Sequence, residues 1–250
     1  MNYSTVTVAL FCLMTGLSGL SAGAERYQVV TEEWAPFNYL ENHQIAGMTT
    51  EIVRAIMATG DDFEIVLLPS MRASHVLKSK PRTILYSMFR TPEREQSFKW
   101  VGPIVEESIH PWQLAKALPV SSLEQLMHAP QITTRHAGLL PDLLRSMGFS
   151  NLDRSATESL QLYRMLLAGR TRIIIGDTDA GVAYYSRQLG IPDGTLRQIP
   201  IELYRSSLYI AFSPDSDDRL VAAWADALEQ LRESGELARI KHRYELPAGP

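Results

Sequence analysis

The sequence of 250 residues contains a single cysteine, Cys12, close to its amino terminus. One cysteine cannot build a disulfide framework or a cysteine-rich zinc site. The six histidines show no H-x-H or H-x-x-x-H spacing, so we expect no metal site. No glycine-rich phosphate loop of the P-loop or dinucleotide type occurs either, and we expect no cofactor.

Runs of basic residues are also missing. Lys and Arg total 24 against 28 Asp and Glu, which gives a net charge of −4. This balance argues against a nucleic-acid-binding protein and against a polybasic membrane-surface protein. After the first 24 residues, no apolar stretch approaches the roughly 20 residues that cross a bilayer. Hydrophobic residues nevertheless make up 45% of the chain, enough to bury a core.

The amino-terminal segment, residues 1–24, contains no Asp, Glu, Lys or Arg. An apolar run from Val6 to Leu20 leads to Ala22-x-Ala24, the small-residue pattern that a signal peptidase accepts. We therefore predict a cleaved signal peptide at residues 1–24 and an exported, soluble protein. Its removal would also remove Cys12.

Short β-rich runs alternate with amphipathic helical stretches along the rest of the chain. We expect strands at 27–30, 63–67, 83–87, 131–134, 172–176 and 208–212, and helices at 47–59, 70–80, 121–127, 139–147, 157–168, 216–232 and 236–244. Ser121-x-x-Glu124 is interpreted as a capping box. The pattern predicts an α/β protein with mostly parallel sheets flanked by helices. Two such blocks follow each other without a flexible linker, which favours two lobes that pack together.

The turn after the strand ending at Ser87 carries the strongest local signal. Thr91 as N-cap, with Pro92 at the first helical position, predicts a helix start. Such a start at the carboxyl end of a parallel strand offers backbone N–H groups to an anion. Arg94 would add a bidentate donor for a carboxylate. The alternative is that Arg94 forms an ordinary surface ion pair with Glu93, Glu95 or a neighbouring acid.

A second candidate is the aromatic loop Trp34-Ala35-Pro36-Phe37-Asn38-Tyr39, which follows the first strand. In open α/β sheets, ligands bind at this edge. Trp34 would stack on a ligand and attract an ammonium group by a cation–π interaction. The alternative is packing of the loop onto the core, which we favour for Phe37 and weigh evenly for Trp34.

A third candidate is Asp177 in Gly176-Asp177-Thr178-Asp179, after a predicted buried strand. An acid there either holds a cationic group or caps the next helix. With two aspartates, one is free to cap while the other faces the cleft. Arg72, which follows Pro69 in another strand-to-helix turn, is a weaker candidate of the same kind.

The order of these motifs resembles the bacterial extracellular solute-binding proteins of family 3, the periplasmic polar-amino-acid-binding type, over residues 26–245. The motifs are W-x-P-F at 34–37, Gly47 with Glu51, P-x-x-R at 69–72, T-P-E-R-E at 91–95, W-x-G-P at 100–103, Ser-Leu-Glu-Gln-Leu at 122–126, Gly169-Arg170 and Gly176-Asp177. The resemblance implies the type 2 periplasmic binding protein fold, in which two α/β lobes are joined by two crossing strands. Lobe 1 would hold residues 25–108 and 208–250, and lobe 2 residues 109–207.

The resemblance also implies roles for single residues. Arg94 would grip a ligand α-carboxylate, Trp34 would stack on the ligand, and Asp177 would receive the α-ammonium. The sequence departs from the family at Met88-Phe89-Arg90 and at Arg135-His136-Ala137-Gly138, which leaves three alternatives open: an amino acid, another small anion, or no ligand. The candidate ligand-binding residues are Arg94, Trp34, Asp177, Arg72, Ser87, Thr91, Phe89 and Arg135, and none is expected to be catalytic.

The implied function is capture of a small polar, carboxylate-bearing solute in the periplasm for a membrane ABC importer, without enzymatic activity. Two alternatives stay open. One is an enzyme of the cyclohexadienyl dehydratase type, which needs a general acid over the substrate ring. The other is a periplasmic sensor that docks on a membrane receptor. The expected partners are the solute and a permease or receptor, with no nucleic acid, and the protein is expected to be a monomer.

Overall fold

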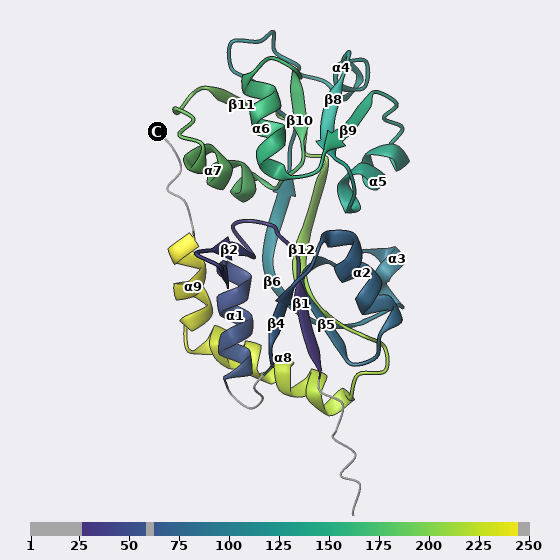
Figure 1. Cartoon of the computed structure of the whole chain (residues 1–250), viewed down its shortest axis with the longest axis vertical. Coiled ribbons are helices and arrows are strands. Elements are labelled where there is room, and N and C mark those ends of the chain that lie inside the picture. Colours follow the sequence, from purple (N-terminus) through teal and green to yellow (C-terminus); the bar gives the residue numbers. More distant parts are fainter. Residues whose placement is uncertain (1–26, 59–62, 245–250) are drawn as a thin grey trace, which may run out of the picture.

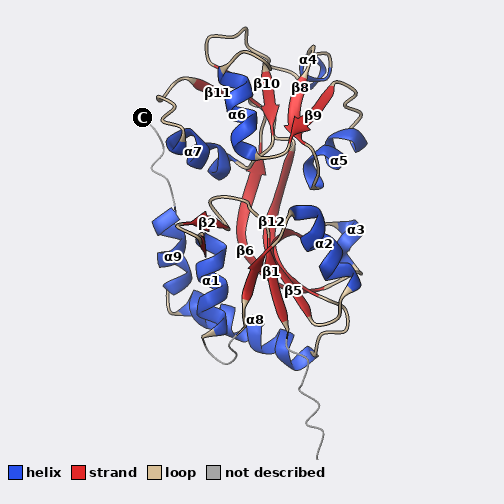
Figure 2. Cartoon of the chain, in the orientation of Figure 1, coloured by secondary structure: helices blue, strands red, loops and turns tan. Residues whose placement is uncertain are grey.

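The computed structural model describes residues 27–58 and 63–244 (Figure 1). The predicted signal peptide and Cys12 lie outside these residues. Two five-stranded sheets, each flanked by helices, form two lobes (Figure 2). This arrangement agrees with the two-lobed α/β organisation expected from the sequence.

Lobe 1 is built on a sheet with the strand order β4-β1-β5-β12-β6. The strands are β1 (Gln28–Thr31), β4 (Ile65–Leu67), β5 (Thr83–Phe89), β6 (Lys99–Ile109) and β12 (Tyr204–Phe212), beside a hairpin of β2 (Tyr39–Glu41) and β3 (Gln44–Ala46). The helices are α1 (Met48–Met57), α2 (Ser70–Ser79), α3 (Pro92–Glu95), α8 (Asp218–Glu233) and α9 (Glu236–Tyr244). Helices α1 and α9 lie on one side of the sheet and α2 and α3 on the other (Figure 1).

Lobe 2 has the strand order β11-β7-β10-β8-β9. Its strands are β7 (Trp112–Leu114), β8 (Ile132–Arg135), β9 (Leu152–Ala156), β10 (Ile173–Ile175) and β11 (Leu196–Gln198). Its helices are α4 (Leu123–Met127), α5 (Leu139–Ser146), α6 (Ser159–Leu167) and α7 (Asp179–Gln188).

The sheets are mixed, whereas the sequence analysis expected mostly parallel ones. In lobe 1, β1 is parallel to β4 and β5, but β12 is antiparallel to β5 and β6. In lobe 2, β8 is parallel to β9 and β10, but β7 is antiparallel to β10 and β11. The antiparallel pairs arise because the chain enters and leaves lobe 2 through β6 and β12, which run side by side in opposite directions.

The two crossing strands form the connection between the lobes. β6 pairs with β12 from Tyr204 opposite Ile109 to Phe212 opposite Lys99. β12 pairs with β5 only from Leu208 onward, so residues 204–207 and 106–109 form a ribbon of two strands. The predicted lobe boundaries fall in this ribbon and stay a prediction.

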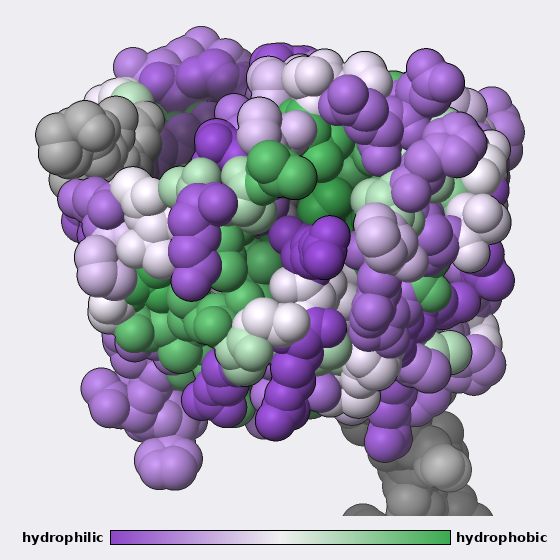
Figure 3. All heavy atoms as spheres, turned by 90° about the horizontal axis from the view of Figure 1, so that it is seen from above, coloured by the Kyte–Doolittle hydropathy of each residue, from purple (hydrophilic) through white to green (hydrophobic). Residues whose placement is uncertain are grey.

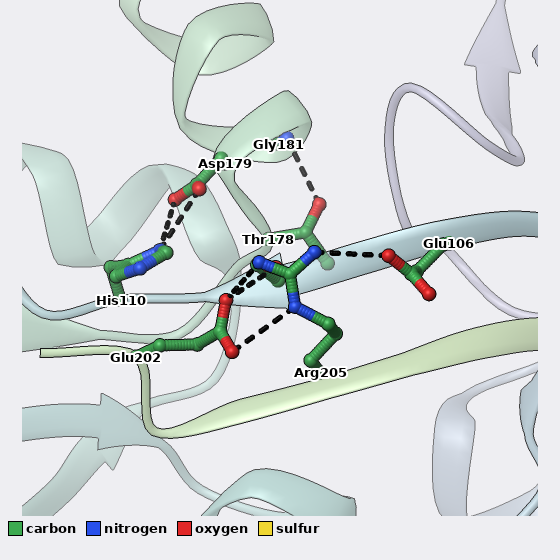
Figure 4. Close-up of polar contacts among 8 residues, drawn as sticks. Glu106, His110, Thr178, Asp179, Gly181, Glu202 and Arg205 are labelled. Atoms are coloured by element: carbon green, nitrogen blue, oxygen red, sulfur yellow. Dashed lines mark hydrogen bonds and ion pairs between the residues drawn. The ribbon is translucent and has the colours of Figure 1, made fainter.

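Polar side chains hold the ribbon together (Figure 4). Arg205 on β12 donates to Glu106 on β6 at 2.9 Å and to Glu202 at 3.1 Å. Nearby, His110 lies 2.9 Å from a carboxylate oxygen of Asp179 in lobe 2. The segment between the lobes is therefore lined with charged and titratable groups.

Helix α4 shows how the local sequence sets a boundary, one residue later than predicted. Ser122, not Ser121, is the N-cap, and its Oγ accepts a hydrogen bond from the Gln125 amide at 3.1 Å. The Gln125 side chain accepts from the Ser121 amide at 2.9 Å. Ser122 and Gln125 therefore cap the helix, with the Gln125 side chain bound to the residue before the N-cap, and Glu124 takes no part in this cap.

The surface at the lobe 2 end mixes hydrophobic patches with hydrophilic residues (Figure 3). The most exposed large hydrophobic side chain among the described residues is Leu118, which is 89% exposed. No helix within residues 27–58 and 63–244 has the length and apolar character needed to cross a membrane.

Candidate ligand-binding site

A cavity of about 640 Å³ lies between the lobes and is lined by residues from both. Lobe 1 contributes residues at the carboxyl ends of β1 and β5, one face of α2, and Arg94. Lobe 2 contributes Gly176, Arg154 and a segment from Arg135 to Asp142. The carboxyl ends of parallel strands meet at this edge, which is where α/β sheets place ligands.

Arg94 lines the cavity from the single turn α3. Its Nη1 donates weakly to the Phe89 carbonyl at 3.3 Å, and burial lowers the pKa of its guanidinium. None of the described carboxylates forms an ion pair with it, and Glu95 pairs with Arg90 instead. The structure thus does not show the alternative of a surface pair with Glu93 or Glu95, and the donors of Arg94 are available to an anion.

The start of α3 contributes less to anion binding than the sequence suggested. Thr91 is the N-cap and Pro92 the first helical residue, as predicted. The helix ends at Glu95, however, and Thr91 is buried and does not line the cavity. Because a single turn sums few peptide dipoles, the anion-binding capacity of this segment rests on the Arg94 side chain.

Ser87 lines the cavity with a strained backbone. Its φ is 63°, in the left-handed region that non-glycine residues rarely adopt. The β5–β12 ladder shifts register between Tyr209 and Ala211, opposite this part of β5. Ser87 is 3% exposed, and its hydroxyl has no hydrogen-bond partner among the described residues. Strain together with an unsatisfied buried hydroxyl is typical of a residue held in place to meet a ligand.

Trp34 and Phe89 form an aromatic wall of the cavity. The Trp34 ring meets those of Phe37 and Phe89 edge-to-face, with centroids 5.0 Å and 5.5 Å away. Trp34 is 8% exposed and Phe37 is fully buried. Phe37 is a core residue, as we favoured, and Trp34 both packs on the core and faces the cavity.

The aromatic loop is anchored by the amino terminus of α1. The amides of Met48 and Thr49 donate to the carbonyls of Pro36 and Phe37, each at 2.9 Å. Gly47 has a φ of 115°, and a Cβ there would lie 2.4 Å from the Phe37 carbonyl oxygen. Only glycine allows this close approach. The helix terminus therefore fixes the loop that carries Trp34.

Arg135, at the end of β8, faces lobe 1 across the cavity. Its Nη2 lies 3.9 Å from a carboxylate oxygen of Glu32, which follows β1. Arg154 lies beside it, and its Nε donates to the His136 carbonyl at 3.0 Å. The N-cap of α5, Gly138, supplies no side-chain cap, so first-turn amides of α5 add donors to this part of the lining.

Asp177 does not line the cavity. It is 2% exposed, and its carboxylate accepts hydrogen bonds from Ser159 Oγ at 2.7 Å and Tyr163 OH at 3.0 Å. Burial raises its pKa. In this structure Asp177 is an internal acceptor, which does not support its predicted contact with an α-ammonium.

The expected aspartate cap of α7 and the expected role of Arg72 also need correction. Thr178, not an aspartate, is the N-cap of α7, and its Oγ1 accepts from the Gly181 amide at 3.3 Å. The carboxylate of Asp179 contacts the imidazole of His110. Arg72 is exposed on α2 and does not line the cavity. Of the eight predicted residues, the cavity brings together Trp34, Ser87, Phe89, Arg94 and Arg135.

Several charged lining residues were missed by the sequence analysis: Glu32, His75, Lys78, Asp142 and Arg154. Glu32 had a detectable signal, because it follows the first strand just before Trp34. His75 and Lys78 are spaced i, i+3 on α2 and so share a helix face. For Arg154 and Asp142 we find no local signal, since the folding of lobe 2 alone brings them to the cavity.

The lobes also touch on the side of α7. The rings of Tyr39 in β2 and Tyr184 in α7 lie 5.1 Å apart. Ala35 and Tyr39 pack into the apolar cluster of lobe 2 that includes Leu162 and Val182. Among the described residues, no group of three or more His, Cys, Asp or Glu side chains is placed to hold a metal ion.

Two α/β lobes joined by two crossing strands over an interlobe cavity define the type 2 periplasmic binding protein fold. Residues 27–247 match the family described as "Bacterial extracellular solute-binding proteins, family 3". The chain belongs to this family. The comparison with curated proteins gave no match.

Solved structures support the fold. A histidine kinase sensor domain with similarity to periplasmic binding proteins aligns with a TM-score of 0.79 at 19% identity, covering 90% of this chain and 98% of that one. The arginine-, lysine-, histidine-binding protein ArtJ from Geobacillus stearothermophilus aligns at 0.74 and 21%, covering 90% and 97%. The GluR0 ligand-binding core from Nostoc punctiforme, in complex with L-glutamate, aligns at 0.76 and 18%, covering 88% and 100%. At these identities the likeness shows the fold alone.

Proposed function

We propose that this protein is a monomeric periplasmic solute-binding protein that captures a small carboxylate-bearing, amino-acid-like solute between its lobes for a membrane ABC importer. The observation that carries the proposal is Arg94, a half-buried guanidinium without an ion-pair partner among the described residues, in an interlobe cavity. Its desolvation disfavours the charged form, and a ligand carboxylate would offset that cost. Charge-assisted hydrogen bonds of this kind contribute about 1.5–3 kcal/mol each.

The aromatic wall and the Ser87 hydroxyl fit the same ligand. Trp34 and Phe89 would cover its apolar part, while Ser87 would donate to the carboxylate bound by Arg94. Because the cavity is lined by both lobes, a bound solute favours the state in which they lie together, and this closed state is what a membrane partner would recognise.

A sensor role is the second candidate, favoured by the structural likeness to a histidine kinase sensor domain. Capture of the solute would be the same, but the closed lobes would signal to a receptor instead of delivering cargo. Co-purification from membranes with either a permease or a kinase, in the presence of the solute, separates the two roles.

We propose binding without catalysis. The dehydratase alternative needs a general acid positioned over the substrate ring. Of the two carboxylates of the lining, Asp142 pairs with Arg145 and Glu32 lies 3.9 Å from Arg135. Turnover of prephenate or arogenate by the purified protein would overturn this part of the proposal.

The test of the function is a thermal-shift screen of small carboxylic acids and amino acids, followed by calorimetry on the wild type and on Arg94→Gln. A ligand of the folded state raises Tm. We expect Arg94→Gln to weaken binding by about 2–5 kcal/mol, because it removes one side of a buried charge pair. Arg187→Gln, an exposed arginine at the end of α7, is the matched control. Unchanged affinity in Arg94→Gln would remove Arg94 from the site.

A further inference from the structure

The charged side chains that line the cavity do not balance. Four are cations (Lys78, Arg94, Arg135, Arg154) and two are carboxylates (Glu32, Asp142). Asp142 already pairs with Arg145, which lies outside the lining, and Glu32 lies 3.9 Å from Arg135. The lining therefore carries positive charge that its own carboxylates do not neutralise.

Two of the cations without an ion pair lie on opposite lobes. Among the described residues, neither Arg94 in lobe 1 nor Arg154 in lobe 2 pairs with a carboxylate. Arg154 is oriented by its hydrogen bond to the His136 carbonyl at 3.0 Å, and its Nη1 is not used in that contact. Enclosing both guanidinium groups costs hydration unless an anion meets each of them.

An ammonium group, by contrast, finds no carboxylate in the lining that is without a nearby arginine. Asp142 pairs with Arg145, Glu32 lies 3.9 Å from Arg135, and Asp177 is buried with its oxygens taken by Ser159 and Tyr163. A zwitterionic amino acid such as alanine brings one negative and one positive charge, so it would leave the excess in place. A dianion would neutralise it.

Apolar side chains share the cavity lining with the two arginines. Trp34, Leu85, Phe89, Ile109, Leu139 and Leu140 line the same cavity. A volume of about 640 Å³ accommodates a carbon skeleton between two anionic ends.

We infer that the cavity takes a dicarboxylic acid without an α-ammonium group, with one carboxylate on Arg94, the other on Arg154, and the skeleton along Trp34 and Phe89. This inference rests on the proposed function: it keeps the carboxylate-bearing solute and replaces the amino-acid-like class with diacids. A ligand held at both ends by different lobes also couples binding to closure.

The test is calorimetry with matched probes on the full chain. Glutarate is compared with butyrate, which lacks the second carboxylate, and with L-glutamate, which adds the ammonium; isophthalate and benzoate form an aromatic pair. We expect each diacid to bind at least about tenfold more tightly than its comparison compounds. That ratio corresponds to about one bidentate contact between an arginine and a carboxylate. Arg154→Gln should remove the higher affinity of the diacid over the monoacid, and Arg94→Gln should lower the affinity for all probes. Arg187→Gln should leave all these affinities unchanged.

The outcomes separate this inference from the proposed function. Tighter binding of L-glutamate or L-arginine than of glutarate would overturn the inference and leave the proposed function standing. Binding of none of these probes at about 1 mM would contradict both. A diacid preference that survives Arg154→Gln, in a variant with an unchanged melting temperature, would show that Arg154 is not the second anchor.

Discussion

Ser87 illustrates at the scale of one residue how this site is held ready. A serine with φ of 63° in the middle of a fully buried strand is disfavoured on its own. The surrounding sheet enforces the conformation, because β5 is the central strand of lobe 1. The hydroxyl then lines the cavity without an internal partner.

Replacing Ser87 should separate stability from binding. Glycine adopts positive φ freely, so Ser87→Gly relieves the backbone strain. The free energy of unfolding of Ser87→Gly should equal that of Ser87→Ala or exceed it by up to about 1 kcal/mol. Both variants lose the hydroxyl and should bind the carboxylate ligand up to about tenfold more weakly. Urea unfolding and calorimetry measure the two effects. Full affinity in both variants would show that the hydroxyl does not contact the ligand.

Sequence reasoning placed a residue at the cavity where that position is set by the residue's own turn. Arg94 and Trp34 follow strands, so the strand order alone places them at the cavity. It did not succeed for Asp177, because the fate of that carboxylate depends on Ser159 and Tyr163 in α6. Those two donors are brought to Asp177 by tertiary packing, which the local pattern does not contain.

At the scale of helices and strands, too, the elements with a clear local sequence pattern were predicted and the others were not. Strands with continuous apolar runs, such as β5 and β10, were predicted because burial on both faces leaves a clear pattern. The eleven residues of β6 were not, since Gly102-Pro103 interrupts the strand pattern in the sequence and the burial of β6 follows no alternation. Helix α7 was not predicted either, because its first turn contains a glycine and its apolar stripe is weak.

Contacts between β2 and α7 hold the two lobes together beside the cavity. Tyr39 and Tyr184 pack their rings at 5.1 Å and share a hydrogen bond through their hydroxyls. Aromatic pairs of this kind contribute about 0.5–1.5 kcal/mol. They favour the closed arrangement, and the apparent affinity for a solute depends on how much of that arrangement is populated.

Tyr184→Ala should therefore lower apparent solute affinity by about two- to tenfold, although Tyr184 does not line the cavity. Small-angle scattering should show a larger radius of gyration for the unliganded variant than for the wild type. Tyr184→Phe, which keeps the ring and loses only the hydroxyl, serves as the control and should stay close to the wild type. Identical scattering for all three proteins would refute this role of the tyrosine pair.

The connecting strand β6 carries a group that titrates near neutral pH. Burial raises the pKa of Glu107 from 4.5 to about 7, opposed by a hydrogen bond with Thr178 and reinforced by the charge of Asp179. Between those two pH values the folded protein keeps a proton that the unfolded chain has released. The free energy of unfolding should therefore fall as pH rises through this window.

Glu107→Gln should remove this part of the pH dependence, on the order of 1–3 kcal/mol between pH 4.5 and 7. Urea unfolding of the wild type and the variant at several pH values measures the difference. The neighbouring His110–Asp179 pair is present in both proteins. Parallel stability curves for the two proteins would contradict the raised pKa.

The whole molecule is two mixed sheets connected by one ribbon of two strands, with charged residues at the ribbon and cations at the cavity. Few backbone connections cross between the lobes, so relative motion is the expected response to a ligand. The lobes make apolar contacts on the α7 side, where Ala35 and Tyr39 pack against lobe 2. The opposite side, between α2 and α5, is where the cavity lining is polar and charged.

The most direct test of the account is a crystal structure of the protein grown with the tightest ligand from the carboxylate screen. We predict a ligand carboxylate bound bidentately by Arg94 between the lobes, with Ser87 as a further donor and the skeleton against Trp34. A ligand bound elsewhere, or one in the cavity with its carboxylate turned away from Arg94, would contradict the account.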